Sequence, residues 1–292
     1  MATGSTLPRR ILARRLTEMR ERSKLSRTKA AAAVEMNGQT LWRLESGQNS
    51  QIKRMVINAL CDLYGASADD RALMIWLAEE SRKTGWWQSY SDAISADVEL
   101  FVGLEQSARH ITSFQLTLLP GLVQTHAYRR SIARTYQPPL SEDEIDRRME
   151  LLAKRQARLE EPPDKFALEV LLSEAALAHH VGGAVVMAEQ LRYLAELAEL
   201  PSVSIRIIPL DAGSHLGLQV GPFVLLEFPE HTNPVLTEPP VVYVEGYTGA
   251  LYLDKADEID QYRTARSAIR AVALDETESR KLLLKMAKEY GT

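Results

Sequence analysis

The side chains that could carry out catalysis or bind a metal are few and scattered in this sequence. His179 and His180 are adjacent, so on a helix they point about 100° apart, and no carboxylate or cysteine lies beside them at ligand spacing. The segment 211–217 holds an Asp, a Ser and a His in one short loop, whereas a nucleophilic triad needs them to converge from separate elements. The pair Gly182-Gly183 lacks the Lys-Ser or Lys-Thr of a phosphate-binding loop. We therefore expect no enzyme, no metal and no cofactor.

Three carboxylates lie in apolar surroundings, namely Glu105, Glu174 and Glu245. Paired carboxylates could perform acid-base chemistry. More often such residues accept hydrogen bonds from buried backbone N–H groups or from arginines, and that structural role is the interpretation we favour.

Cysteine content and hydropathy restrict where the chain can work. The single cysteine, Cys61, allows neither a disulfide framework nor a cysteine metal site within one chain, which suits a reducing cytoplasm. The N-terminal segment of eight residues is short and polar, and no uninterrupted apolar stretch approaches about 18 residues. We expect a cytoplasmic protein without membrane insertion.

The charge of the chain is divided very unevenly. Residues 1–65 carry 12 Lys and Arg against 5 Asp and Glu, a balance of +7. The remaining residues carry 35 − 12 = 23 against 39 − 5 = 34, or −11, which together give the net charge of −4. A basic head on an acidic body is typical of a protein whose first domain meets a polyanion, although a basic run can also be a solvated helix face.

Apolar residues at helical spacing predict five helices in the first eighty residues. Leu12, Leu16 and Met19 form the stripe of the first helix. The others are expected at 27–34, 38–46, 52–64 and 68–81, with Ser26 and Asn37 as N-caps. The fourth should turn Met55, Val56, Ala59, Leu60 and Leu63 inward. Two short helices joined by a tight turn in a basic bundle can set the second helix into the major groove.

The rest of the chain predicts a larger α+β domain with a small, mostly antiparallel sheet. We expect a helix over 96–113, a turn at Pro120-Gly121 and a long helix opened by the capping box Ser141/Glu144. Alternating or apolar runs predict strands at 166–172, 203–210, 223–228, 241–246 and 250–254. The chain should therefore be multi-domain, with an all-α domain over 1–82 and the α+β domain over 83–292.

The segment Leu25–Gly47, LSRTKAAAAVEMNGQTLWRLESG, resembles the lambda-repressor-like helix-turn-helix family of transcriptional regulators. The resemblance implies that Gln39 and Arg43 face the bases, where Gln can address adenine and Arg can address guanine bidentately. It also implies that Arg27 contacts a phosphate and that Arg20 and Glu45 form a structural ion pair. The residues expected at the DNA are Arg27, Asn37, Gln39, Thr40, Arg43, Asn49, Lys53 and Arg54.

Two residues depart from the family pattern. Gly38 stands where relatives present a base-contacting side chain, and Glu35 replaces a small turn residue. The basic pair Arg9-Arg10 could compensate for the missing base-contacting side chain at Gly38 by reaching a phosphate or the minor groove.

The second region resembles the C-terminal domain of actinobacterial antitoxin-like regulators. The motifs that carry this resemblance are LPGLVQT at 119–125, RQARL at 155–159, SEAALAHHVGG at 173–183, AEQLRYLAELAELPSVSIRIIPL at 188–210 and VVYVEG at 241–246. This resemblance implies a non-catalytic regulator whose C-terminal domain binds a small protein encoded nearby.

These observations leave three hypotheses about function. The first is a dimeric regulator of double-stranded DNA that receives its signal from a partner protein, because one small recognition helix contacts too few bases. The second is a regulator whose C-terminal domain binds a small-molecule effector. The third, an enzyme with a nucleic-acid anchor, would need a cleft of strongly perturbed titratable groups.

Overall fold

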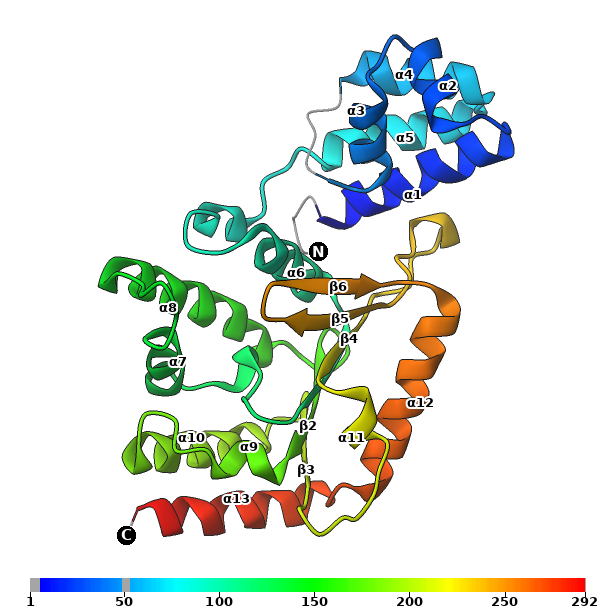
Figure 1. Ribbon diagram of the computed structural model, residues 1–292. Helices are drawn as coiled ribbons and strands as arrows, with labels where there is room; N and C mark the ends of the chain where they lie inside the picture. Colours follow the sequence, from blue (N-terminus) through cyan, green and yellow to red (C-terminus); the bar gives the residue numbers. More distant parts are fainter. Residues whose placement is uncertain (1–5, 49–52, 292) are drawn as a thin grey trace. The chain divides into compact units, whose positions relative to one another are not determined.

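The computed structural model describes residues 6–48 and 53–291, which form two compact units (Figure 1). Unit 1 holds the chain up to Ser89 together with the segment Pro229–Glu238. Unit 2 holds Tyr90–Phe228 and the chain from Pro239 onward. The chain therefore passes between the units three times. An all-α region followed by a larger α+β region is the predicted fold class, and it is confirmed.

Five α-helices build unit 1 around one apolar core. They are α1 (Thr6–Arg22), α2 (Arg27–Ala33), α3 (Gly38–Glu45), α4 (Arg54–Tyr64) and α5 (Ala68–Glu80), followed by the 3-10 helix η1 (Trp86–Tyr90). Leu12 and Leu16 of α1, Leu41 of α3 and Leu60 of α4 are fully buried in this core. The five predicted helices are thus all present.

The prediction for Met55 was wrong. Its side chain is 75% exposed, whereas Ile57, Leu60 and Tyr64 are buried. These residues recur at spacings of three and four, so they define the inward stripe of α4, and Met55 lies outside that stripe.

The segment Pro229–Glu238, which contains the 3-10 helix η4 (Pro234–Leu236), packs on helix α1 within unit 1. Leu236 contacts the apolar core. The Glu238 carboxylate is fully buried and binds Arg10 Nε at 2.5 Å and Arg14 Nη1 at 2.8 Å. Arg14 also donates to the backbone oxygen of Thr237 at 3.1 Å. A segment more than 220 residues further along the chain thus supplies the counter-ion of two α1 arginines.

A six-stranded mixed sheet with the order β3-β2-β1-β4-β5-β6 forms the centre of unit 2. The strands are β1 (His110–Gln115), β2 (Ala167–Ser173), β3 (Val203–Ile208), β4 (Phe223–Glu227), β5 (Val241–Gly246) and β6 (Gly249–Leu253). Strands β1, β2 and β3 are parallel, and the pairs β1–β4, β4–β5 and β5–β6 are antiparallel.

Strand β1 corrects the prediction of one helix over 96–113. Helix α6 (Ala96–Ser107) ends early, and residues 110–115 form a strand in the interior of the sheet. Residues 111–114 are buried on both faces of that strand. A strand covered on both sides loses the apolar-polar alternation that would reveal it, so its apolar run was taken for a helix.

The remaining helices flank the sheet. They are η2 (Gly121–Val123), α7 (His126–Ala133), α8 (Glu142–Gln156), η3 (Ala157–Glu160), α9 (Glu174–Ala178), α10 (Ala184–Leu197), α11 (Gly217–Val220), α12 (Ala256–Val272) and α13 (Glu276–Tyr290). The predicted capping box of α8 is confirmed, with Ser141 Oγ accepting from Glu144 N and the Glu144 carboxylate accepting from Ser141 N. Helices α10 and α13 pack side by side (Figure 1).

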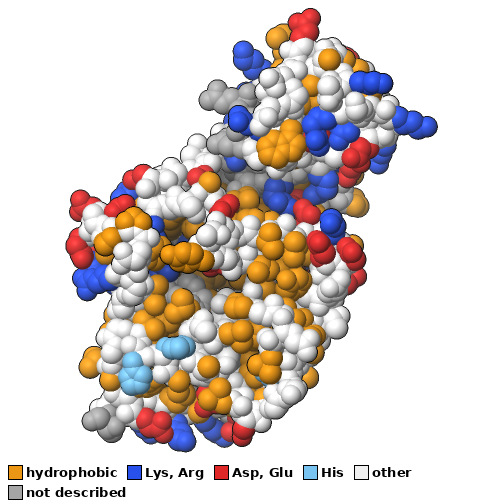
Figure 2. Space-filling view, in the orientation of Figure 1, with side chains coloured by type: hydrophobic (Ala, Val, Ile, Leu, Met, Phe, Trp, Pro, Cys, Tyr) orange, Lys and Arg blue, Asp and Glu red, His pale blue; other side chains and the backbone are white. Residues whose placement is uncertain are grey.

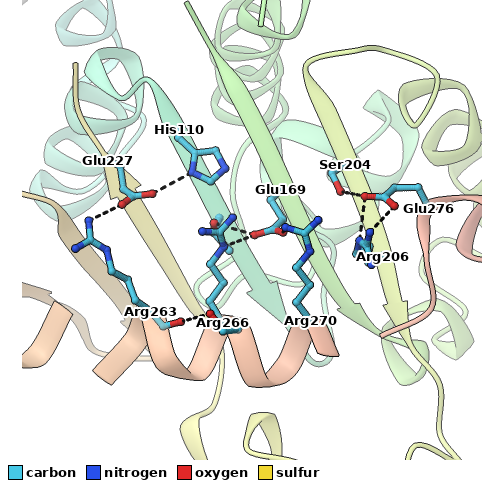
Figure 3. A network of polar contacts seen from close by, with 11 residues as sticks. His110, Glu169, Ser204, Arg206, Glu227, Arg263, Arg266, Arg270 and Glu276 are labelled. Carbon is cyan, nitrogen blue, oxygen red and sulfur yellow. Dashed lines mark hydrogen bonds and ion pairs between the residues drawn. The ribbon is translucent and has the colours of Figure 1, made fainter. Parts of the chain in front are cut away.

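Ion pairs fasten α12 to one face of the sheet, and the pair between Arg206 of β3 and Glu276 joins α13 to it (Figure 3). The buried Glu169 of β2 binds Arg266 at 2.5 Å and Arg270 at 3.2 Å. On β4, Glu227 binds His110 Nδ1 of β1 at 3.1 Å and Arg263 of α12 at 2.6 Å. Each pair joins a strand to its neighbour or to the covering helix, so the network fixes α12 across three strands.

Glu227 makes the stability of unit 2 depend on pH. The His110 hydrogen bond and the Arg263 pair lower the pKa of Glu227 from 4.5 to about 2. A lowered carboxyl pKa stabilises the fold above the ordinary value and loses that effect as the pH falls from about 4.5 towards about 2. We expect the difference in Tm between wild type and Glu227→Gln to narrow over this range in circular dichroism melts. Glu150→Gln, an exposed position of α8, serves as control, and an unchanged difference for Glu227→Gln would contradict this assignment.

Candidate nucleic-acid interface

Local capping sets the ends of the helix pair α2 and α3. Ser26 Oγ accepts from Lys29 N at 3.3 Å at the start of α2, and Asn37 Oδ1 accepts from Gln39 N at 2.8 Å at the start of α3. Between the helices Glu35 has a φ of 51°, a left-handed conformation that favours glycine. The tight turn is therefore made with a residue that is unusual there, as the sequence comparison with the family pattern indicated.

Helix α3 has one buried face and one exposed face. Leu41 and Leu44 are buried in the core of unit 1. Gln39, Thr40 and Arg43 are all exposed. Because the apolar residues anchor the helix from behind, these three polar side chains face solvent together. That is the arrangement a recognition helix requires before it can enter a groove.

An ion cluster holds the C-terminal end of α3. The Glu45 side chain is only 1% exposed and accepts from Arg20 Nε at 2.6 Å and from Arg27 Nε at 2.8 Å. The hydrogen bond to Glu45 raises the pKa of Arg20 despite partial burial. Glu45 therefore ties α3 to α1 and to the start of α2. Arg27 enters this cluster through Nε and stays 41% exposed, so it faces both the cluster and solvent.

The other residues singled out from the sequence lie at helix ends. Asn37 is engaged as the N-cap of α3, and Lys53 occupies the N-cap position of α4 and is exposed. Arg54 is exposed and lies 3.7 Å from Glu79. Asn49 lies outside the described residues.

Arg10 has a partner that the sequence did not predict, and Trp42 lies exposed on the recognition helix. Arg10 is bound to Glu238, which engages it within unit 1 rather than leaving it wholly available to a phosphate. Trp42 is 39% exposed on α3, beside the residues that face solvent.

The carboxylates first considered for acid-base chemistry have structural partners, with one exception. Glu105 binds Arg155 through two hydrogen bonds of 2.7 and 2.8 Å, and Glu174 accepts from Leu210 N at 2.9 Å, so the favoured interpretation is confirmed for both. Glu245 is exposed instead, which corrects its assignment to apolar surroundings.

Neither a metal cluster nor a membrane-spanning helix is found in the described parts of the chain. Over residues 6–48 and 53–291, no three His, Cys, Asp or Glu side chains are grouped so that they could hold a metal ion. In the same ranges every helix is too short or too polar to cross a bilayer.

Comparison with family models assigns both regions. Residues 11–74 match a family described as a helix-turn-helix domain. Together with the exposed face of α3, this match defines the chain as a DNA-binding helix-turn-helix regulator. Residues 98–285, more than half of the chain, match a family described as a domain of unknown function, DUF5753, and the chain belongs to this family. No curated protein and no solved structure gave a match.

Proposed function

We propose that this protein is a sequence-specific transcriptional regulator that binds double-stranded DNA as a dimer and receives its signal through the C-terminal domain. The observation that carries the proposal is the exposed polar face of α3, where Gln39, Thr40 and Arg43 lie opposite the buried Leu41 and Leu44. A short helix with this pattern, backed by a rigid bundle, can be inserted into the major groove.

Each exposed residue has a role that its chemistry supports. We assign Gln39 and Arg43 to base edges, since amide and guanidinium groups make bidentate pairs with adenine and guanine. We assign Arg27 and Lys53 to phosphates, since both stand at the start of a helix and carry positive charge towards solvent. Thr40 would contact a phosphate or a thymine methyl group. Asn37, Asn49 and Arg54 complete the proposed set.

Dimerisation follows from the small size of the recognition element. Helix α3 has eight residues, and one such helix reads too few base pairs for useful specificity. Two copies on a partly palindromic site, with half-sites one helical turn apart, would double the contacts. Sedimentation of the chain with and without a symmetric duplex measures this stoichiometry directly.

The domain over 83–292 is proposed to receive the signal from a small partner protein, as the resemblance to antitoxin-like regulators implies. A small-molecule effector is the second candidate. It is favoured by Arg148 of α8, whose buried Nε has no hydrogen-bond acceptor among the described residues and is suited to an anionic group. Isolation of the chain with its neighbouring gene products tests the first candidate.

Arg43→Ala tests the assignment of α3 to the bases. The preferred duplex is obtained first, by selecting from a random pool with the wild-type chain. We expect Arg43→Ala to lose about 1 to 3 kcal/mol of binding free energy on that duplex, because a bidentate pair to guanine is lost, and to lose much less on random DNA. Fluorescence anisotropy at fixed salt measures both affinities.

Two further variants make the result interpretable. Arg27→Ala should weaken all duplexes to a similar degree, as expected for a phosphate contact. Arg71→Ala removes the same charge from α5, where Arg71 pairs with Asp62, and should leave sequence preference unchanged. If Arg43→Ala weakened selected and random duplexes equally, α3 would not be the reading element.

A further inference from the structure

Two arginines of unit 2 differ from their neighbours in having no ion pair within 4.0 Å, although, after the hydrogen bonds with Ser141, the charge of Arg148 also lowers the pKa of Glu144 from further away. Over residues 6–48 and 53–291, no carboxylate oxygen lies within 4.0 Å of Arg129 on α7 or Arg148 on α8. Other arginines of the same two helices do have such partners: Arg130 binds Glu142 and Asp146, Arg147 binds Asp92, and Arg155 binds Glu105. The absence of such an ion pair is therefore particular to these two side chains.

The two unpaired guanidinium groups lie close together and beside Tyr136. Arg148 Cζ lies 4.7 Å from the centre of the Tyr136 ring, and the same tyrosine partly offsets the lowering of the pKa of Arg129. Burial, followed by the positive charges of Arg155 and Arg148, lowers the pKa of Arg129. Arg148 Nε is buried and has no hydrogen-bond acceptor among the described residues. Three positive charges thus gather here, and only Arg155 is neutralised by an ion pair.

The surroundings of these arginines are partly apolar and partly open. Tyr136 is 38% exposed. The centre of the Phe101 ring on α6 lies 5.8 Å from Arg155 Cζ and 4.4 Å from the centre of the Tyr243 ring on β5. Figure 2 shows the surface of unit 2 hollowed between α8 and the β5–β6 hairpin, with hydrophobic side chains at the rim. Arg129 and Arg148 are themselves half-buried, so a ligand could approach them from solvent.

The LPGLVQT and RQARL motifs meet at the same place. A Cβ at Gly121 would lie 3.1 Å from Arg155 Nη1, so glycine leaves room for the guanidinium. Gln156 Nε2 donates to the backbone oxygens of Leu122 and Gln124 at 3.2 and 2.7 Å. These contacts hold the C-terminal end of α8, and with it Arg155, in a fixed position.

Placing like charges together with only one close counter-ion, the Glu105 carboxylate, is unfavourable, and buried charged groups are normally paired. Guanidinium groups hold carboxylates and phosphates through paired N–H donors, which would relieve both the repulsion and the unmet donor of Arg148. We propose that Arg129 and Arg148, with Arg155 behind them, form a binding site for a small molecule that carries a carboxylate or phosphate group.

The site stands independently of DNA binding, because all three arginines belong to unit 2. Only its use as the signal input rests on the proposed function. Occupancy by an anion would neutralise the cluster and join α7 to α8 through the ligand.

The test uses the purified full chain and three single variants: Arg129→Gln, Arg148→Gln and the control Arg130→Gln. Tm is recorded in rising inorganic phosphate and, separately, in rising citrate, against sodium chloride at equal ionic strength. We expect wild type and Arg130→Gln to gain about 3 to 6 °C for each tenfold rise in ligand above Kd, and Arg129→Gln and Arg148→Gln to gain nothing. The stronger of the two responses identifies phosphate or carboxylate as the preferred group.

Ligand-free Tm values provide an independent criterion. If the arginines serve a ligand, Arg129→Gln and Arg148→Gln should leave Tm unchanged or raise it, since each removes a repelling charge. The proposed anion site would be refuted by a clear fall in the ligand-free Tm of Arg129→Gln and Arg148→Gln. It would also be refuted if wild type and all three variants responded equally to both anions. DNA binding is measured separately on the same samples. An anion response without DNA binding would refute the proposed function as a transcriptional regulator but not the proposed anion site.

Discussion

Glu45→Gln is expected to destabilise unit 1 by about 3 to 5 kcal/mol, the range measured when one partner of a buried ion pair is removed. Glu45 is buried and accepts from both Arg20 and Arg27, so the substitution leaves the buried Arg20 without its buried counter-ion and loosens the end of α3. Affinity for DNA should fall with stability, because the recognition helix loses its tie to α1 and α2.

Tryptophan fluorescence follows this unfolding selectively. All four tryptophans, Trp42, Trp76, Trp86 and Trp87, belong to unit 1. In urea the midpoint of the fluorescence transition should fall by roughly 2 M. Glu21→Gln is the matched control, since Glu21 lies 3.6 Å from the same Arg20 but is 65% exposed, and its curve should stay almost unchanged. Equal curves for Glu45→Gln and wild type would show that the cluster contributes nothing to the fold.

Glu105→Gln is expected to destabilise unit 2 by a similar amount, about 3 to 5 kcal/mol. Glu105 is 2% exposed and holds both Nε and Nη2 of Arg155, which joins α6 to α8. The amide can accept only part of this hydrogen bonding and carries no charge. Burial disfavours the charged form of Arg155, and Glu105 is the principal group that offsets this effect and raises the pKa of Arg155.

Far-UV circular dichroism, which reports the helices of both units, measures the loss in unit 2. The tryptophan transition should stay near that of wild type while the circular dichroism transition moves to lower temperature. Asp92→Asn is the control. It removes an exposed ion pair of 2.8 Å to Arg147, which lies on α8 as Arg155 does, and it should leave both transitions nearly unchanged. If Glu105→Gln behaved like Asp92→Asn, α6 and α8 would be held by apolar packing alone.

Features fixed by neighbouring residues could be predicted from the sequence. The caps Ser26, Asn37 and Ser141 act within three residues along the chain, so their chemistry is visible in the sequence itself. The five helices of unit 1 and five of the six strands were predicted for the same reason. Strand β1 was missed because its surroundings on both faces, and not its own pattern, decide its conformation.

The candidate sites divide in the same way. The exposed face of α3 follows from the spacing of Leu41 and Leu44, and the sequence therefore predicted which residues point outward. Arg129 and Arg148 could not be distinguished from the other arginines of α7 and α8, because only the tertiary structure shows which of them meet a carboxylate. The partners Glu238 and Arg10 lie 228 residues apart, and no local pattern connects them.

The segment that carries Glu238 limits how the protein can be divided into fragments. A polypeptide ending at Ser89 would contain all five helices of unit 1 but not the carboxylate shared by Arg10 and Arg14, nor the contact of Leu236. The two regions are therefore not freely exchangeable modules. A proteolytic cut or a gene truncation after α5 would separate the helical bundle from the segment Pro229–Glu238, which belongs to the same folded unit. The chain is therefore best expressed and engineered at full length.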